Sequence, residues 1–301
     1  MNPKYSVIVI TYFHEDYIKK TLESILMQSV VGDLEIIIGD DGSKDNTVKI
    51  LNEYKEKYSF IHIFAHENVG ISKNLYDLLK KANGEYIAIL EGDDYWIDVD
   101  KLKKQRFIIE NNDCIATACN SLKVDNQGNT LGVWNNYLES GVLTVDQVLS
   151  YQTKICHPSG FFFKNIFKNS GNKYEVVANA SRMGGCHSGM INLLASNGGI
   201  YYDNSLMVVW RVVTGTGTKN YTSQSHNNPL DFYDAMRKYI MYDKYFAFNY
   251  ERHIYTEFRQ CVKAMRKEVV SNIGCYRFFK GIIEYNVYNI ISKIKKLLNK
   301  V

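Results

Sequence analysis

Closely spaced cysteine pairs are absent from this 301-residue chain, which contains no C-x-x-C motif. No secretory leader precedes the first apolar run, which begins close to Met1. Together these two absences predict reduced thiols and a cytoplasmic protein. The thiols concerned are those of Cys114, Cys119, Cys156, Cys186, Cys261 and Cys275.

Long apolar runs are absent as well, since no segment reaches about 18 apolar residues without a charge, and none is therefore expected to span a membrane. The composition, 46% hydrophobic and 23% charged, has no collagen-like, disordered or low-complexity character. The net charge is only +4, and no stripe of basic and aromatic residues runs along the chain, so we expect no nucleic-acid partner. The length fits a globular protein of one or two domains.

What the chain does have is an alternation of short β-branched runs with segments of helical period over its first hundred residues. This alternation predicts an α/β protein with parallel strands joined by crossover helices, and the continuous apolar runs predict strands covered on both faces. Strands are expected at 5–12, 34–39, 60–65, 86–90 and 114–124, and helices at 15–27, 46–58, 72–82 and 100–110. A turn is expected at 125–129, and residues 130–220 show no regular pattern.

Polar loops follow three of the predicted strands, at Thr11–Tyr12, 40–43 and 91–94. Because ligands bind at the carboxyl ends of parallel strands, these loops are expected to face one crevice. The last loop places Glu91, Asp93 and Asp94 close together, and like charges repel unless a cation neutralises them. A Mg²⁺ or Mn²⁺ ion shared with substrate phosphates satisfies that requirement. The alternative is a solvated turn that caps the next helix.

Four segments in order resemble family 2 of the glycosyltransferases, which have the GT-A fold. They are S-V-I-V-I-T-Y-F at 6–13, G-D-D-G-S-K-D-N-T at 39–47, N-V-G-I-S-K-N-L at 68–75 and A-N-G-E-Y-I-A-I-L-E-G-D-D-Y-W at 82–96. The resemblance is strong over 4–125 and weak to about 215. It implies a Rossmann-like, mostly parallel sheet flanked by helices, and transfer of a hexosyl group from a nucleotide-diphosphate sugar, with a UDP-sugar favoured. A Mn²⁺ or Mg²⁺ cofactor, an inverting displacement and a glycan or lipid-linked acceptor in bacterial envelope polysaccharide synthesis are also implied.

The resemblance also assigns donor residues. It implies nucleotide contacts for Thr11, Tyr12, Asp40 and Asp41, a phosphate contact for Lys73, ribose or metal-bound water for Glu91, a direct metal bond for Asp93 supported by Asp94, and a sugar or base contact for Trp96. Glu91 departs from the Asp that the family usually has at the first acidic position. A plain surface lysine is the alternative for Lys73, and a core anchor is the alternative for Trp96.

The acceptor half lacks the acidic pair that opens a helix in the family and supplies the general base. His187 lies close to that place in the sequence, and an imidazole can accept a proton near neutral pH. The alternatives are a structural histidine beside a different base, or a nucleotide-sugar-binding protein that has lost catalysis. His157 is predicted to line the acceptor pocket, and Arg211, next to the 214–218 loop, to clamp the diphosphate.

The chain is predicted to divide into a GT-A domain at 1–222, with a nucleotide-sugar half at 1–125 and an acceptor half at 126–222, and a helical region at 223–301. Within that region, residues 277–301 combine helical apolar spacing with lysines near the end. Such a helix binds the anionic inner face of the cell membrane, or it docks on the catalytic domain or on a second copy in a homo-oligomer.

Overall fold

The computed structural model describes residues 3–144, 147–148, 155–171, 174 and 186–212. The predicted helical region at 223–301, its basic segment at 277–301 and the 214–218 loop lie outside the described residues. None of the helices in the described part combines the length and apolar character that crossing a membrane requires.

The alternation of strands and helices predicted for the first 124 residues is confirmed, with boundaries within a few residues of the expected ones. The elements are β1 (Tyr5–Thr11), α1 (Ile18–Leu26), β2 (Leu34–Asp40), α2 (Thr47–Lys57), β3 (Ile61–Ala65), α3 (Ile71–Leu79), β4 (Tyr86–Glu91), α4 (Lys101–Asn111) and β6 (Ala116–Val124). A short 3₁₀ turn, η1 (Val31–Asp33), precedes β2, and the two-residue strand β5 (Tyr95–Trp96) follows the acidic loop.

The following part of the chain contains regular elements that the sequence pattern did not predict. They are β7 (Thr130–Val133), β8 (Gly141–Val142), the 3₁₀ turn η3 (Pro158–Gly160), β9 (Phe161–Lys164), α6 (Cys186–Gly198) and β10 (Ile200–Arg211). The length of β10 is concealed in the sequence by polar residues at its centre, where the pairing with β6 shifts register between Asp203 and Val208. The predicted turn at 125–129 is confirmed by hydrogen bonds from Gln127 and Asn129 to the side chain of Asp125.

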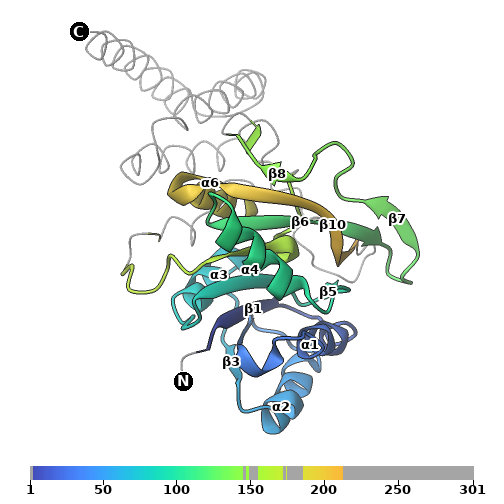
Figure 1. The fold of residues 1–301 in the computed structure, drawn as a ribbon. Helices are drawn as coiled ribbons and strands as arrows, with labels where there is room; N and C mark the ends of the chain where they lie inside the picture. The colour runs from blue at the N-terminus through green and yellow to red at the C-terminus, as the bar shows by residue number, and fades with distance from the viewer. Residues whose placement is uncertain (1–2, 145–146, 149–154, 172–173, 175–185, 213–301) are drawn as a thin grey trace, which may run out of the picture.

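The strands form one mixed sheet in the order β3-β2-β1-β4-β9-β6-β10-β5, with β7 paired to β6 and β8 to β10 (Figure 1). The pairs β1–β2, β1–β4, β2–β3 and β6–β10 are parallel. Strand β9 is antiparallel to both β4 and β6, so β4 and β6 run in the same direction. The carboxyl ends of β1, β2, β4, β6 and β10 therefore share one edge of the sheet, and the expected α/β class with its mostly parallel long strands is confirmed.

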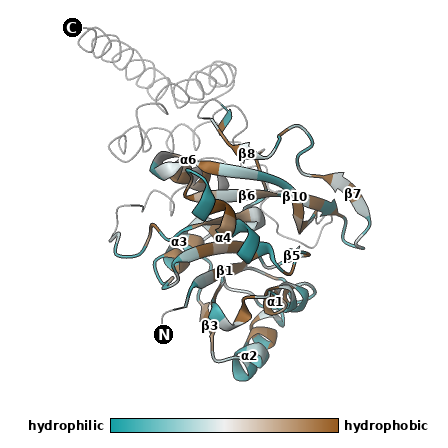
Figure 2. Cartoon of the chain, viewed as in Figure 1, coloured by the Kyte–Doolittle hydropathy of each residue, from teal (hydrophilic) through white to brown (hydrophobic). Residues whose placement is uncertain are grey.

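Both faces of the sheet are covered, as the apolar runs predicted. Along β1, Val7 and Val9 face the core that contains α1, α2 and α4, whereas Ile8 and Ile10 face the core that contains α3 and α6. Figure 2 shows the amphipathic character of α2 and α4, each of which has hydrophobic and hydrophilic residues. Successive side chains of β1 therefore point into two different cores, and neither face of the strand is exposed to solvent.

The amino end of the central sheet is closed by a buried carboxylate and a glycine. The side chain of Glu35 accepts hydrogen bonds from the Ser6 hydroxyl and from the backbone N–H groups of Asn83 and Gly84. At Gly84 an added Cβ would lie 2.6 Å from the backbone nitrogen of Ser6. Because Ser6 belongs to the central strand, its backbone has little freedom to move aside.

Replacing Gly84 with alanine is therefore expected to lower the free energy of unfolding by about 1 to 3 kcal/mol through overpacking. The measurement is urea denaturation followed by circular dichroism. Gly32→Ala is the matched control, because no atom lies within 4 Å of an added Cβ at that position. Equal denaturation midpoints for the two variants would contradict the close packing of this turn against β1.

Candidate active site

The loops at the carboxyl ends of β1, β2 and β4 are joined directly to one another. The backbone N–H of Asp41 donates to the carbonyl of Thr11 at 3.0 Å, and that of Gly92 donates to the carbonyl of Ile10 at 2.8 Å. The three polar loops picked out in the sequence thus meet at one edge of the sheet. This is the arrangement expected when parallel strands end together.

The two aspartates at the end of β2 hold two loops at this edge of the sheet in place. Asp40 accepts hydrogen bonds from the backbone and hydroxyl of Ser43, and Asp41 accepts from the backbone N–H groups of Val69 and Gly70 at 2.7 and 3.0 Å. Burial raises the pKa of Asp41, and the two N–H groups oppose that rise. Both carboxylates are engaged within the chain, so their contacts with a nucleotide stay predictions.

Asp94 lies at the centre of the acidic loop and is completely enclosed. Its Oδ1 accepts a hydrogen bond from the backbone N–H of Arg211 at 3.0 Å, and its Oδ2 accepts one from the hydroxyl of Ser159 at 2.5 Å. The carboxylate side chain has no exposed surface, and Oδ2 lies 3.0 Å from Nδ1 of His157. A single carboxylate therefore joins the ends of β4 and β10 to the η3 turn.

His157, from the acceptor half, has one ring nitrogen close to Asp94 and the other close to Glu91. It is 5% exposed, and its Nε2 lies 3.7 Å from Oε2 of Glu91. The Nδ1 atom faces Oδ2 of Asp94 at 3.0 Å, an ion-pair distance. One ligand atom from each of Glu91, Asp94 and His157 lies within 4.8 Å of the other two, a spacing that suits a metal ion.

Burial and neighbouring charges shift the pKa values of the residues in this cluster. Burial raises the pKa of Glu91 from its usual 4.5 to about 8, although His157 opposes the rise and the neighbouring aspartates add to it. Burial lowers the pKa of His157, but Asp94 and Glu91 outweigh that effect and leave the pKa above its ordinary value. The cluster therefore holds protons that a divalent cation would displace.

Asp93, the predicted metal ligand, faces a histidine that the sequence reasoning did not select. Its Oδ2 lies 3.8 Å from Nε2 of His14, whose Nδ1 is 3.2 Å from the hydroxyl of Thr11. Burial raises the pKa of Asp93, and His14 lowers it. Gly92 is required here, because an added Cβ would lie 2.6 Å from Nδ1 of His14.

Two predicted donor contacts have geometries that favour their alternatives. Trp96 is only 2% exposed and donates its indole N–H to the carbonyl of Ser159, which favours the core anchor. Lys73 is half exposed and pairs with Asp77 one turn along α3, which favours a surface lysine. Tyr12 is partly exposed and packs edge-on against the ring of Phe13.

Arg211, which was predicted to clamp the diphosphate, makes hydrogen bonds to the acidic loop. It is 8% exposed, and its Nε donates to the carbonyl of Asp93 at 3.2 Å. The guanidinium lies 4.7 Å from the ring centroid of Tyr17, a cation–π distance. The predicted base, His187, lies in the first turn of α6, but its side chain is outside the described residues and its role stays a prediction.

Trp134 and Trp210, which the sequence did not mark as site residues, lie next to His157, and Lys123 lies over both indoles. The ring of Trp210 stacks on His157 at 5.2 Å, and the ring of Trp134 meets Trp210 edge-on at 4.7 Å. The Nζ of Lys123 lies 5.5 and 5.7 Å from the centroids of these two indoles. Nothing in the sequence indicated that these three side chains would come together, because Lys123 and Trp210 are neighbours only through the pairing of β6 with β10.

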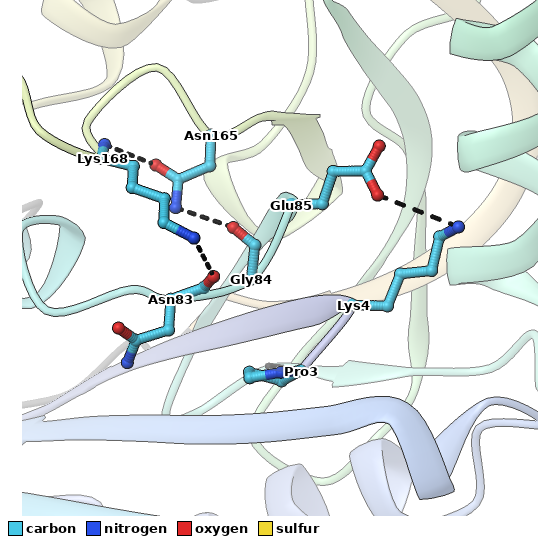
Figure 3. Close-up of a pocket in the computed structure, with 7 residues that line it drawn as sticks. All are labelled: Pro3, Lys4, Asn83, Gly84, Glu85, Asn165 and Lys168. Atoms are coloured by element: carbon cyan, nitrogen blue, oxygen red, sulfur yellow. Dashed lines mark hydrogen bonds and ion pairs between the residues drawn. The ribbon is translucent and has the colours of Figure 1, made fainter. Parts of the chain in front are cut away.

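A hollow of about 460 Å³ lies elsewhere, at the amino ends of β1 and β4 (Figure 3). Its polar groups bind one another: Asn165 donates to the carbonyl of Gly84, Lys168 to that of Asn83, and Lys4 lies 3.9 Å from Glu85. Because this hollow is on the edge opposite the acidic loop, it is not the candidate active site.

Comparisons with known proteins identify the family that the sequence matches. The pattern of the family described as Glycosyl transferase family 2 matches residues 6–169. Over 110 residues the chain is 41% identical to the putative teichuronic acid biosynthesis glycosyltransferase TuaG of Bacillus subtilis, which is 36% of this chain and 43% of TuaG. The chain spans less than half of the length of the curated relatives that it matches.

Solved structures share the fold at low sequence identity. TarS of S. aureus, residues 1–349 with UDP-GlcNAc, superposes with a TM-score of 0.60 at 19% identity, covering 85% of this chain and 66% of TarS. The mannosyltransferase PcManGT of Pyrobaculum calidifontis, solved with GDP-Man and Mn²⁺, has a TM-score of 0.51 at 16% identity, covering 100% of this chain and 89% of PcManGT.

The raised pKa of Glu91 predicts how stability without metal depends on pH. The folded protein keeps a proton that the unfolded chain loses above about pH 4.5, so the unfolding temperature in EDTA should fall between about pH 5 and pH 8 and level off above that. The raised pKa of His157 acts in the same direction. The stability that its protonated ring contributes is lost as the pH rises through the pKa of His157 in the folded protein. Thermal unfolding across this range is the measurement.

Glu91→Gln should flatten this dependence and raise the unfolding temperature at pH 8. The exposed Glu67→Gln serves as the matched control. Parallel pH profiles for wild type and Glu91→Gln would contradict the assignment.

Proposed function

The chain belongs to glycosyl transferase family 2, and we propose that it is a metal-dependent, inverting hexosyltransferase that uses a UDP-sugar and a glycan or lipid-linked acceptor. The observation that carries this proposal is the cluster of buried carboxylates at the sheet edge. It lies between the loops of β1 and β2 on one side and the ends of β6 and β10 on the other. Two substrates bound on the two sides would meet there.

Support for the donor class comes from proteins that share the fold. TarS has been solved with UDP-GlcNAc and PcManGT with GDP-Man and Mn²⁺, so nucleotide-sugar binding is common to these neighbours. Several curated relatives are named for envelope polymers, among them TuaG and a poly(ribitol-phosphate) β-glucosyltransferase. On this basis we propose a UDP-sugar donor and an envelope-glycan acceptor for this chain.

The residues present fit a divalent cation. The support is the spacing of one ligand atom from each of Glu91, Asp94 and His157, which lie within 4.8 Å of one another, and the raised pKa of Glu91 beside them. Asp93, together with the cluster of Glu91, Asp94 and His157, would hold the ion. When bound, the ion would neutralise the leaving nucleoside diphosphate.

The chain's own groups complete the proposed site. Thr11, Tyr12 and Asp40 would contact the nucleotide at the ends of β1 and β2. Arg211 holds the backbone of the acidic loop in place, so that the carboxylates keep their positions when charge develops. His187 would accept the proton of the attacking acceptor hydroxyl.

The domain division and location are part of the same proposal. Residues 1–222 would form the catalytic domain, and 223–301 a helical region. We propose a cytoplasmic enzyme whose segment 277–301 contacts the inner membrane face or a second copy.

Metal dependence is tested with Asp93→Asn. Wild type should bind Mn²⁺ in the presence of UDP, seen as a rise in unfolding temperature, and should turn over a UDP-sugar only with the ion. The variant should lose the shift and about 100-fold or more of the turnover. The exposed Asp113→Asn is the matched control. Full turnover in EDTA would overturn the metal assignment.

The proposed base is tested with His187→Ala. Transfer should fall by about 100-fold or more, whereas UDP binding should be unchanged, because the base acts on the acceptor alone. His62→Ala, at an exposed position of β3, is the control. Wild-type turnover by His187→Ala would remove this residue from the mechanism.

A further inference from the structure

The cluster of Lys123, Trp134 and Trp210 lies at the same edge of the sheet as the acidic loop, apart from the loops of β1 and β2. Lys123 and Trp210 are register partners near the carboxyl ends of β6 and β10, and Trp134 follows β7. All three side chains are partly exposed. The cluster touches the acidic site through His157, whose ring stacks on Trp210 with an interplanar angle of 24°.

The sheet order separates this cluster from the nucleotide side. Strands β1 and β2 lie on one side of β4, which carries the acidic loop, whereas β6 and β10 lie on the other side, beyond β9. A donor that reaches from the loops of β1 and β2 to the acidic loop would end its sugar close to His157. A group bound at the cluster would therefore approach that sugar from the opposite side.

The side chains indicate what such a group is. Partly exposed indoles offer apolar faces and edges to the C–H surfaces of a sugar ring, with little loss of side-chain entropy. Lys123 adds a positive charge, and no carboxylate of the described residues lies within ion-pair distance of its Nζ, which instead rests over the two indoles. A cation held by aromatic rings is available to an anion.

We propose that Lys123, Trp134 and Trp210 form the acceptor subsite, and that it takes a sugar or polyol that carries a phosphate or a carboxylate. This inference rests on the proposed function, because it names the acceptor class for the same site. The indoles bind the ring or chain of the acceptor, and the ammonium group pairs with its anion. The neighbouring His157 then lies between the acceptor and the acidic loop.

The test is a titration of the full chain, saturated with UDP and Mn²⁺, by intrinsic fluorescence. Methyl β-D-glucuronide and ribitol 5-phosphate are the anionic probes, and methyl β-D-glucoside is the neutral one. Quenching reports this subsite, because the remaining tryptophan, Trp96, is buried in the core. Wild type should bind at least one anionic probe about 10-fold or more tightly than the neutral probe.

Lys123→Met keeps the aliphatic stem and should abolish the preference for the anionic probe while leaving the affinity for UDP unchanged. Lys103→Met, an exposed lysine on α4, is the matched control and should retain the preference. Trp210→Phe should weaken the binding of charged and neutral probes together. Unfolding temperatures of the variants establish that each is folded.

Equal binding of charged and neutral probes by wild type, or no binding of either, would overturn the proposal. A loss of UDP affinity in Lys123→Met would also overturn it, because the cation would then belong to the donor diphosphate. Failure of wild type to bind UDP with Mn²⁺ contradicts the proposed function itself, whereas UDP binding without anion preference contradicts the acceptor subsite alone.

Discussion

The buried carboxylate of Asp94 is the interaction on which the rest of the site depends. It binds the backbone of Arg211, the hydroxyl of Ser159 and, at ion-pair distance, the ring of His157. These partners come from β10 and from the η3 turn, which are far from the acidic loop in sequence. Breaking a buried ion pair by removing one partner typically costs about 3 to 5 kcal/mol, so this one side chain fixes how the two halves of the site meet.

Enclosing Asp94 also determines the charge of its neighbours. The nearest basic side chains to Glu91 and Asp93 are His157 and His14, at 3.7 and 3.8 Å, and burial raises the pKa of both carboxyl groups. The apoprotein therefore carries its acidic loop partly protonated. In the proposed function, a cation and a diphosphate would replace these protons, because ion binding neutralises the carboxylates in their place.

The sequence predicted the features that depend on residues near one another in the chain, and not those that depend on contacts between distant residues. Strands such as β1 are recognisable because their apolar residues are consecutive, and the meeting of the three polar loops follows from parallel pairing alone. The pairing of His157 with Asp94 could not be predicted, because it depends on β9 inserting antiparallel between β4 and β6. The same insertion places Ser159 over Trp96, which favours a core position for an aromatic residue that adjoins the acidic motif.

The two sides of the site therefore differ in how they are built. The side formed by β1 and β2 consists of successive βα units with short loops, whose polar residues are fixed by local turns such as the one that Asp40 makes with Ser43. The other side consists of strands β6 and β10, where Lys123 and Trp210 are adjacent only through cross-strand pairing. Side chains on this pair can change without disturbing the turns that hold Asp40 and Asp41. Under the proposed function, acceptor recognition could therefore vary on the β6–β10 side while Asp94 keeps the acidic loop in place.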